Sequence, residues 1–589
     1  ETVNESAQQR QKTLDMFASG KPTEWRNRLI WGDKKYILPS LLPEFAGKVD
    51  LIYIDPPFDT GANFSFKATI PDNPETSEDE TTDFIKQPSI IEQKAYRDTW
   101  GKGLQSYLQW FYETIIVLRE LLSEDGSIYV HLDWHIGHYA KIILDEVFGY
   151  ENFRNEIIWH YSGWNKKLNT SFERRHDLIY YYSKSSIPSF NSYFKEWSSK
   201  EDYVKRRKQK LRFDENGREY VLSDAGGGKR VKRYLDEAMA EGVVVDDVWD
   251  IDKINNSAKE FLNYQTQKPE RLINRFIKAS SDKGDLILDC FIGSGTTLAV
   301  AEKLNRRWIA CDLGRFAIHT TRKRMLSIEN VKPFVVQNLG KYERQQWVKA
   351  EFDNSDNRAI QEKAYRNFII DLNQAQPLKD HTWLHGSKAG RMIHVGSLDT
   401  PVSLGDIKSI VQEFWKTVGK SPELTTNGID VLGWDFAFEI NETAKQIASE
   451  NKVDMKFRKI PREVLDKKAV EQGDIKFYEM AHLDFKSKKK GKELTLTLDN
   501  FIVPPDDIPE DIRPKITHWR QWIDYWAIDW NFKEDTFHNE YQSYRTKQSP
   551  TIDLSVTHQY EDAGKYIVVV KVIDILGNDT TRSAEIVIK

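Results

Sequence analysis

The chain has 589 residues, 30% of them charged, and a formal net charge of −5. This length exceeds what one hydrophobic core organises, so we expect two to four domains. No run approaches the roughly 18 apolar residues of a membrane-spanning helix, and the polar N-terminal stretch lacks a signal-peptide core. We therefore expect a cytoplasmic protein. The slightly acidic balance argues against a uniformly basic nucleic-acid coat, but it leaves room for a local basic surface.

The first informative stretch is "VDLIYIDPPFDTG", residues 49–61. It predicts a buried strand that stops at Asp55, because Pro56 and Pro57 cannot continue a ladder of hydrogen bonds. The proline carbonyls are then unpaired acceptors beside a carboxylate and the ring of Phe58. Such a cluster suits the amino edge of a nucleobase, which reaches a pocket only after leaving the duplex stack. The alternative is that Asp55 caps a helix after the strand.

Residues 71–89, "PDNPETSEDETTDFIKQPS", are acidic and aperiodic. This composition predicts a mobile loop downstream of the proline motif, either as a surface insertion or as a lid. Residues 104–122 have helical spacing of apolar side chains, 127–133 predict a strand, and 135–149 predict a second helix closed by a glycine. The alternation of strands and helices predicts a doubly wound, mostly parallel α/β sheet.

Three histidines, His131, His135 and His138, lie in this region at irregular spacing. We interpret them as surface or core residues and expect no metal site. The only two cysteines, Cys290 and Cys311, also lack metal-ligand spacing, and they indicate no disulfide framework. The aromatic stretch at 159–167, "WHYSGWNKK", has two equal interpretations: core packing, or a place beside a target base.

Residues 200–233 carry twelve Lys and Arg against six Asp and Glu. A charge run is usually a solvated face. Here it is interleaved with aromatic residues and a "GGGK" turn, as expected of a segment that contacts DNA phosphates. The candidate DNA-binding residues are Lys205, Arg206, Arg207, Lys208, Lys210, Arg212, Lys229, Arg230, Lys232 and Arg233.

The stretch "GDLILDCFIGSGTTLAVAEKLNRRWIACDL" predicts a strand at 286–288, a glycine turn with Gly293 and Gly295, and a helix at 296–304. A second strand ends on Asp312, nineteen residues beyond Gly293, where a carboxylate can bind ribose hydroxyls. No Lys-Ser/Thr of a triphosphate-binding loop occurs. The segment therefore indicates a nucleoside-bearing cofactor without a pyrophosphate.

The motif "DPPF" followed later by "DCFIGSGTT" resembles the beta class of DNA amino-methyltransferases that use S-adenosyl-L-methionine (AdoMet). In this class the catalytic motif precedes a variable basic stretch and the cofactor motif. The chain is also similar to the modification subunits of type III restriction systems in "LIWGDKKYILPSLL", "LLSEDGSIYVHLDWHIGHYAKIILDEVFG", "RRHDLIYYYSK" and "NYQTQKPERLINRFI". The resemblance covers most of residues 25–335.

The resemblance implies that Asp55 and the carbonyl of Pro56 accept the two hydrogens of a target amino group, next to Pro57. Phe58 would stack on the flipped base, although the family more often has tyrosine there. The implied cofactor-binding residues are Asp33, Thr266, Lys268, Asp289, Phe291, Gly293, Gly295, Thr296 and Asp312. Two fixed acceptors localise the amino lone pair for attack on the sulfonium methyl group.

Asp at the first motif position favours adenine N6 by family analogy, with cytosine N4 as the alternative. No cysteine adjoins the prolines, which disfavours carbon-5 cytosine chemistry. We therefore expect an AdoMet-dependent DNA adenine methyltransferase of a restriction-modification or phage-defence system. Expected partners are double-stranded DNA, a helicase or nuclease, and a second copy of the chain. The alternative of another class is a DNA-binding specificity subunit that recruits an effector.

The expected domains are a Rossmann-like methyltransferase at 1–345 with a target-recognition insertion at about 160–262, a small α/β domain at 346–480, and an immunoglobulin-like β-sandwich at 481–589. The tryptophan-rich "THWRQWIDYWAIDW" within the last is expected in the sandwich core rather than on a partner surface. Partner docking, a grip on flanking DNA and dimerisation all stay open as roles of the two C-terminal domains.

Overall fold

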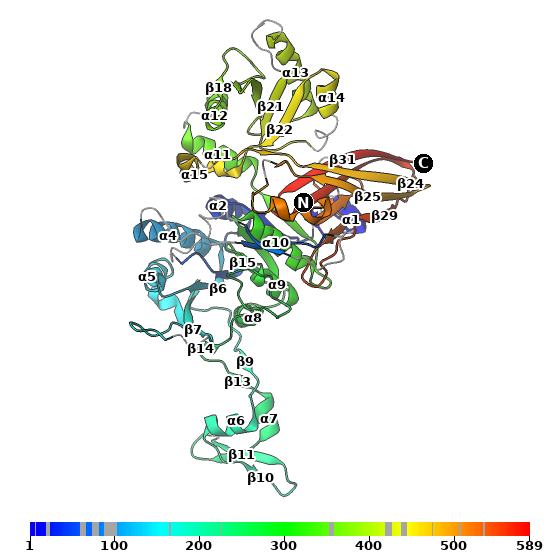
Figure 1. Cartoon of the computed structure of the whole chain (residues 1–589). Helices are drawn as coiled ribbons and strands as arrows, with labels where there is room; N and C mark the ends of the chain where they lie inside the picture. Colours follow the sequence, from blue (N-terminus) through cyan, green and yellow to red (C-terminus); the bar gives the residue numbers. More distant parts are fainter. Residues whose placement is uncertain are drawn as a thin grey trace.

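The centre of the molecule is an eleven-stranded sheet with the strand order β14-β7-β8-β6-β3-β15-β16-β2-β17-β1-β27 (Figure 1). The run from β6 through β3, β15, β16 and β2 to β17 is parallel, and β8 lies antiparallel to both β6 and β7. The bounds are β1 (Thr2–Val3), β2 (Asn27–Trp31), β3 (Val49–Ile54), β6 (Leu122–Leu132), β7 (Phe153–His160), β8 (His176–Ser183), β14 (Val248–Asp250), β15 (Leu286–Asp289), β16 (Arg307–Asp312), β17 (Phe334–Asn338) and β27 (His538–Asn539).

The computed structural model describes residues 1–589 except 6, 19–23, 59–65, 74–81, 87–102, 164–166, 225, 353–357, 419–426, 438–443, 474, 506–507 and 534–535. None of the helices within these ranges combines the length and the apolar character that a membrane crossing requires.

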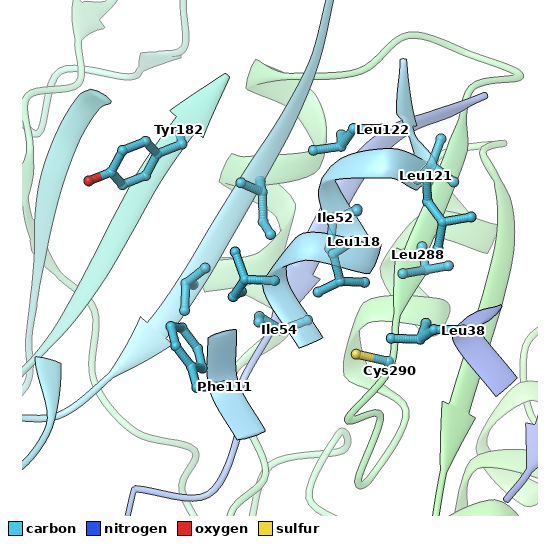
Figure 2. Packing of buried hydrophobic residues seen from close by; sticks show 14 of the residues in the cluster. Leu38, Ile52, Ile54, Phe111, Leu118, Leu121, Leu122, Tyr182, Leu288 and Cys290 are labelled. Atoms are coloured by element: carbon cyan, nitrogen blue, oxygen red, sulfur yellow. The ribbon is translucent and has the colours of Figure 1, made fainter. Parts of the chain in front are cut away.

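Helices cover both faces of the central sheet. Their bounds are α1 (Ala7–Ala18), α2 (Lys34–Phe45), α4 (Leu104–Leu121), α5 (Gly137–Phe148), α8 (Glu270–Ala279), α9 (Thr296–Lys303) and α10 (Arg315–Leu326). Side chains alternate across a strand, so Ile52 and Ile54 of β3 face α2, α4 and α5, while Leu51 and Tyr53 face α8 and α9. Figure 2 shows the first of these layers, with Ile52, Ile54, Phe111 and Leu118 packed together. The expected doubly wound fold is confirmed.

Two predicted boundaries near the catalytic strand shift. Helix α4 ends at Leu121, and β6 begins at Leu122 rather than at residue 127. Part of the expected loop at 71–89 is a strand: β5 (Thr82–Lys86) pairs antiparallel with β4 (Phe66–Ile70). The loop prediction was wrong there because Ile70 and Phe84 are buried against the C-terminal sandwich, a contact that local composition does not reveal. Residues 74–81 and 87–89 of that prediction lie outside the described residues.

A small subdomain projects from the sheet between β8 and β14 (Figure 1, lower part). Trp197, Tyr203, Val221 and Leu235 form its core. Its elements are β9 (Phe194–Lys195), α6 (Lys200–Arg207), β10 (Arg212–Phe213), β11 (Glu219–Asp224), β12 (Arg230–Tyr234), α7 (Leu235–Ala240) and β13 (Val243–Val244).

The C-terminal half contains the expected small α/β unit and β-sandwich. The α/β unit has a six-stranded sheet ordered β18-β19-β20-β21-β22-β23. Its elements are α11 (Lys341–Glu351), α12 (Arg358–Leu372), β18 (Gln376–Pro377), β19 (Gly386–Lys388), β20 (Arg391–Val395), α13 (Leu404–Val418), β21 (Gly428–Gly433), α14 (Lys445–Glu450), β22 (Asp454–Lys459), α15 (Lys467–Gln472) and β23 (Tyr478–Glu479).

The sandwich pairs the sheet β24-β25-β29 with the sheet β28-β26-β30-β31. Trp522, Trp526 and Trp530 lie in its core, as expected. Its strands are β24 (His482–Lys490), β25 (Glu493–Ile502), β26 (Ile523–Asp529), β28 (Tyr541–Tyr544), β29 (Ser555–Gln559), β30 (Gly564–Asp574) and β31 (Asp579–Ile588). Because α11 crosses residue 345 and β27 joins the central sheet, the exact domain boundaries stay predictions.

Candidate active site

The proline motif lies at the carboxyl end of β3, in the middle of the parallel sheet. The strand is buried on both faces, and Ile54 is its last residue paired with β6. Pro56 and Pro57 have no N–H group, so the ladder ends there. The next strand, β15, runs parallel to β3 and ends at Asp289, which brings the proline motif and the glycine turn to the same edge of the sheet. Ligands of open α/β sheets bind at this edge.

One oxygen of the Asp55 carboxylate is an open acceptor. Oδ1 of Asp55 is buried and has no hydrogen-bond partner among the described residues. Nδ1 of His131 lies 4.0 Å from this oxygen, and it is already 2.9 Å from the hydroxyl of Tyr53. The other oxygen, Oδ2, forms an ion pair with Nζ of Lys268. A buried acceptor without a donor is costly to the folded chain, so it marks a place where a ligand N–H group can bind.

The proline carbonyls differ in their contacts. The hydroxyl of Tyr107 donates a hydrogen bond to the carbonyl of Pro57 at 2.9 Å. The prediction that both carbonyls are unpaired was therefore wrong for Pro57, because the α4 side chain that reaches it is far away in sequence. Phe58 is half-buried, and its ring lies 5.9 Å from the ring of His131.

A polar network that sequence reasoning missed lies behind the motif. Nε2 of His131 is 3.2 Å from Oδ2 of Asp177, and the hydroxyl of Tyr161 donates to Oδ1 of Asp177 at 3.1 Å. Burial by itself raises the pKa of Asp177, but the hydrogen bond from His131 and nearby cations lower that pKa to about 2. His131 is fully buried, so this carboxylate fixes the orientation of a histidine beside Asp55. The available signal was two polar residues, His131 and Asp177, inside two apolar strands.

The glycine turn after β15 adopts a backbone that only glycine takes easily. Gly293 has a φ of +51° and Gly295 a φ of +76°, and a Cβ on Gly295 would lie 2.8 Å from Thr321. Asp289 braces this turn by accepting hydrogen bonds from the N–H of Phe291 at 2.9 Å and the hydroxyl of Thr297 at 2.7 Å. Burial raises the pKa of Asp289 to about 7.

Asp312 also braces the turn. Its Oδ2 accepts from the N–H of Gly293 at 2.9 Å, and its Oδ1 accepts from the N–H of Gly314 at 2.7 Å. Asp33 lies beside this end of β16, at the N-terminus of α2, where Oδ1 accepts from the N–H of Lys35 at 2.9 Å. The two carboxylates therefore lie at the ends of neighbouring strands, β16 and β2.

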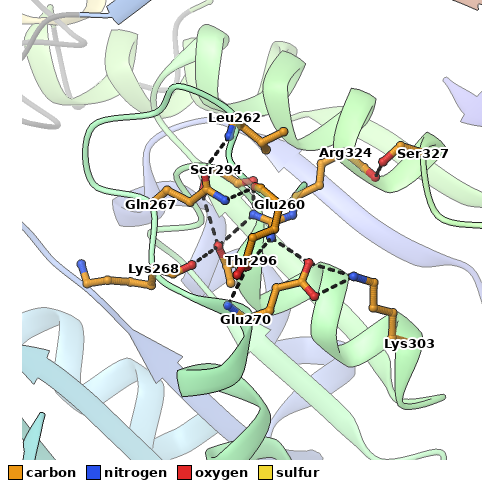
Figure 3. Close-up of polar contacts among 10 residues, drawn as sticks. All are labelled: Glu260, Leu262, Gln267, Lys268, Glu270, Ser294, Thr296, Lys303, Arg324 and Ser327. Atoms are coloured by element: carbon orange, nitrogen blue, oxygen red, sulfur yellow. Dashed lines mark hydrogen bonds and ion pairs between the residues drawn. The ribbon is translucent and has the colours of Figure 1, made fainter. Parts of the chain in front are cut away.

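The segment with Thr266 and Lys268 crosses over the glycine turn. The hydroxyl of Thr296 donates to the carbonyl of Lys268 at 3.1 Å, and Nη1 of Arg324 donates to the same hydroxyl at 2.9 Å. Figure 3 shows this network and the Lys268 side chain extending away from it. The ammonium group of Lys268 pairs with Oδ2 of Asp55. Thr266 is exposed. The structure thus brings Lys268 to the proline motif as well as to the glycine turn.

A second missed group lies near Phe291. Nζ of Lys34 is 3.9 Å from the ring centroid of Trp110 and 5.5 Å from that of Phe291, and only 8% of Lys34 is exposed. The two rings are 5.7 Å apart. Trp110 belongs to the helical pattern of α4, so the sequence presented it as one more core aromatic.

Both cysteines are buried in the sheet, and burial raises the pKa of the Cys290 and Cys311 thiols. A thiol with a raised pKa is a poor nucleophile. Among the described residues, no three His, Cys, Asp or Glu side chains converge as a metal site would require.

The predicted DNA-binding residues gather on the projecting subdomain. All of them are exposed except Arg233, which is half-buried beside Glu241. Arg206 pairs with Asp202 at 2.8 Å. Residues 164–166 of the aromatic stretch lie outside the described part of the chain, while Trp159 is buried and donates to the carbonyl of Ile251 at 2.7 Å.

Comparison with known proteins finds similarity over the part of the chain that holds this site. Residues 49–323 match a family model described as DNA methylase. The type II methyltransferase M.EcaI of Enterobacter cloacae is 28% identical over 339 residues, which cover 51% of this chain and 69% of that protein. The EcoP15I Mod subunit of Escherichia coli, from a type III restriction-modification enzyme, is 30% identical over 181 residues, or 30% of this chain and 26% of the subunit.

The DNA adenine methyltransferase YhdJ of Escherichia coli is 24% identical over 300 residues, which cover 50% of this chain and 81% of that protein. The chain spans 26% to 56% of the length of the type III Mod subunits that it matches. Among solved structures, the PvuII DNA methyltransferase (cytosine-N4-specific) has a TM-score of 0.31 at 16% identity, covering 52% of this chain and 87% of that one.

Proposed function

Because residues 49–323 belong to the DNA methylase family, we propose that this protein transfers a methyl group from AdoMet to the N6 atom of an adenine flipped out of DNA. The observation that carries the proposal is the buried Oδ1 of Asp55, which lacks a donor in the described part of the chain. Relatives named as adenine methyltransferases and the Asp at the first motif position favour adenine. Methylation of cytosine N4 is the alternative.

Asp55 and Pro56 act on the target amino group. Oδ1 of Asp55 accepts one amino hydrogen and the carbonyl of Pro56 accepts the other. Held by two acceptors, the nitrogen becomes pyramidal and its lone pair turns away from the base ring, which makes it a nucleophile. The hydrogen bond from Tyr107 to the Pro57 carbonyl holds the motif rigid, and Phe58 stacks on the base.

The chain's residues fit AdoMet at the glycine turn. AdoMet supplies an electrophilic methyl group on a sulfonium. Gly293 and Gly295 give the turn its positive-φ backbone, and Phe291 supplies an apolar wall. We propose that Asp312 binds the ribose hydroxyls of AdoMet and that Asp33 contacts its adenine. Thr266 and Lys268 would lie at the methionine end of the cofactor. Asp289 and Thr296 hold the turn through the hydrogen bonds that they make within the protein.

Lys268 connects the two halves of the site. Its ammonium group pairs with Oδ2 of Asp55 and is half-buried in the same edge. This ion pair occupies Oδ2 and leaves Oδ1 as the acceptor for the amino group. The same ammonium group attracts the carboxylate of the methionine part of AdoMet, so it aligns the methyl donor with the target base.

Three variants test the proposal. Asp55→Ala and Asp55→Asn should abolish methyl transfer from labelled AdoMet to DNA while AdoMet binding by calorimetry and DNA binding by gel shift persist. Asp499→Ala, on the distant sandwich, is the matched control and should leave transfer unchanged. Digestion of the product to nucleosides and mass spectrometry should detect N6-methyladenine. Detection of N4-methylcytosine instead would establish the alternative base.

The projecting subdomain is the proposed DNA interface. Changing Arg206, Arg207 and Lys208 to Gln should weaken DNA binding and make its dependence on salt shallower, by about one power of salt concentration for each phosphate that is no longer neutralised. The control changes Lys488, Lys489 and Lys490 of the sandwich to Gln together, which removes the same amount of positive charge from another surface. If both sets of substitutions weaken DNA binding equally, the projecting subdomain has no specific role in binding DNA.

The similarity to type III Mod subunits supports a place in a restriction-modification or phage-defence system in the cytoplasm. We propose a helicase or nuclease as the partner and a second copy of the chain as a further one. A specificity subunit without catalysis is the second candidate function. Wild-type protein that binds DNA but no AdoMet in calorimetry would favour this second candidate.

A further inference from the structure

The loop between β7 and β8 exposes a phenylalanine almost completely. The side chain of Phe172 is 96% exposed, and Leu168 in the same loop is 46% exposed. Single exposed apolar residues are ordinary on protein surfaces. Phe172 differs from them because its immediate neighbours are held in place and because the loop lies at the edge of the sheet that contains Asp55.

The residues next to Phe172 anchor the loop. The guanidinium of Arg174 lies 3.7 Å from the ring centroid of Trp134, at the end of β6. Arg175 pairs with Glu173 at 2.6 Å, and its carbonyl accepts from the N–H of Tyr161 at 3.0 Å. These contacts fix the chain at Arg174, two residues after Phe172. The phenyl ring itself is exposed to solvent and is not packed against the protein.

The loop begins beside the catalytic carboxylate. Strand β8 is antiparallel to both β6 and β7, so the carboxyl ends of β6 and β7 point to the same edge as that of β3. Tyr161, the first residue after β7, donates to Asp177, which contacts His131, and His131 lies 4.0 Å from Oδ1 of Asp55.

The loop and its base carry cations, and Glu173, the acid next to Phe172, is already paired with Arg175. Arg174 and Lys167 are exposed in the loop, and Nζ of Lys253 lies 3.9 Å from the ring of Tyr161. Positive charge around an apolar tip suits a duplex, whose phosphates flank a stack of apolar base faces.

We propose that Phe172 is a wedge that enters the DNA duplex and occupies the space from which the target base leaves. The proposal rests on the proposed function and deepens it, because a flipped base leaves a gap in the stack. Apolar side chains inserted between bases unstack and kink the duplex in this way. Leu168 would widen the same apolar tip, while Arg174 holds the loop against Trp134.

The test compares two substrates that differ only in the cost of opening the target. In one, the target adenine is paired with thymine; in the other, it faces an abasic site, so pairing no longer opposes eversion. Phe172→Ala should lower the single-turnover methylation rate on the paired duplex about tenfold or more. On the substrate with the abasic site its rate should stay within about twofold of wild type.

Two further variants serve as controls. Phe172→Trp keeps a large aromatic ring and should retain most of the rate on the paired duplex. Phe190→Ala removes an exposed phenylalanine outside the loop and should change neither rate. An equal fall of the Phe172→Ala rate on both substrates, or no fall on the paired duplex, would overturn the wedge.

A second measurement separates this inference from the proposed function. DNA with 2-aminopurine at the target position fluoresces when that base leaves the stack, whether or not a methyl group is transferred. Loss of this signal in Phe172→Ala with intact DNA binding would support the wedge, and an unchanged signal would refute it. Absence of methyl transfer by wild-type protein on both substrates would refute the proposed function instead.

Discussion

The hydroxyl of Tyr107 in α4 donates a hydrogen bond to the carbonyl of Pro57 at 2.9 Å, across 50 positions of sequence. This hydrogen bond ties the helix that follows residues 59–103 back to the motif that precedes them. The rigidity of the acceptor pair therefore depends on a side chain that looks, in sequence, like one more member of an apolar helical face.

Tyr107→Phe removes this hydrogen bond and leaves the ring in the core. The variant should lose about 1 kcal/mol of stability, because the Pro57 carbonyl loses its donor. The methylation rate should fall by more than this loss of stability explains, because the acceptors become less fixed. Urea unfolding and single-turnover kinetics check both effects, with the exposed Tyr139→Phe as control. An unchanged rate would show that Tyr107 serves stability alone.

Asp289 makes the stability of the chain depend on pH near neutrality. Its pKa is about 7 in the folded protein, against an ordinary value of 3.8. Between these values the folded state holds a proton that the unfolded state releases, so stability falls as pH rises. Each pKa unit corresponds to about 1.4 kcal/mol, so the loss between pH 4 and pH 7 is about 4 kcal/mol.

Asp289→Asn should flatten this dependence, because the amide stays neutral while it can still bond Phe291 and Thr297. Urea unfolding at pH 5, 6, 7 and 8 measures the effect, with Asp499→Asn as the exposed control. A wild-type curve that is level from pH 5 to pH 8 would contradict the assignment.

Phe84 ties the β4–β5 hairpin to the sandwich. It is 3% exposed within the sandwich core, and Nε2 of Gln521 donates to the carbonyl of Pro71 in the hairpin at 2.8 Å. Phe84→Ala should cost about 3 kcal/mol and speed hydrogen exchange in residues 66–73 and 82–86. Ile85→Ala, at 52% exposure, is the matched control.

Phe84→Ala should also lower the methylation rate, because the hairpin follows Phe58 in the chain. Mass spectrometry of exchanged peptides and methylation assays on the same samples link the two observations. Faster exchange with an unchanged methylation rate would show that the sandwich does not support the active site.

Asp524 joins the sandwich to α10 of the methyltransferase sheet. It lies 2.6 Å from Nε2 of His319 and 2.8 Å from Nζ of Lys323. Burial opposes ionisation, but Lys323 and His319 hold the pKa of Asp524 well below its ordinary value. Its contribution to stability is therefore present above about pH 4 and is lost as pH falls further.

Asp524→Ala should cost about 3 kcal/mol at pH 7, because it leaves Lys323 and His319 without their carboxylate. The difference from wild type should shrink in acid, and calorimetric unfolding at pH 7 and pH 3 measures it. Asp553→Ala, in the same domain, is the control. A constant difference across this pH range would argue against a paired, ionised Asp524.

Local sequence patterns are sufficient to predict the elements that carry the proline motif, the glycine turn and the basic surface. Strand β3, the glycine turn and the basic projection follow from an apolar run stopped by prolines, two glycines where φ is positive, and clustered Lys and Arg. Such patterns can be recognised in a short stretch because backbone conformation and solvation act over a few residues.

The distant side chains that complete the site are known only from the tertiary structure. His131 and Tyr107 lie at the proline motif, Asp177 contacts His131, and the predicted cofactor residue Lys268 pairs with Asp55. Phe84 leaves the expected loop to enter the sandwich core. Within its own stretch of sequence, each of these side chains looks like an ordinary core or surface residue. Its role depends on which strands become neighbours in the sheet, and strand order is set by packing between residues far apart in sequence.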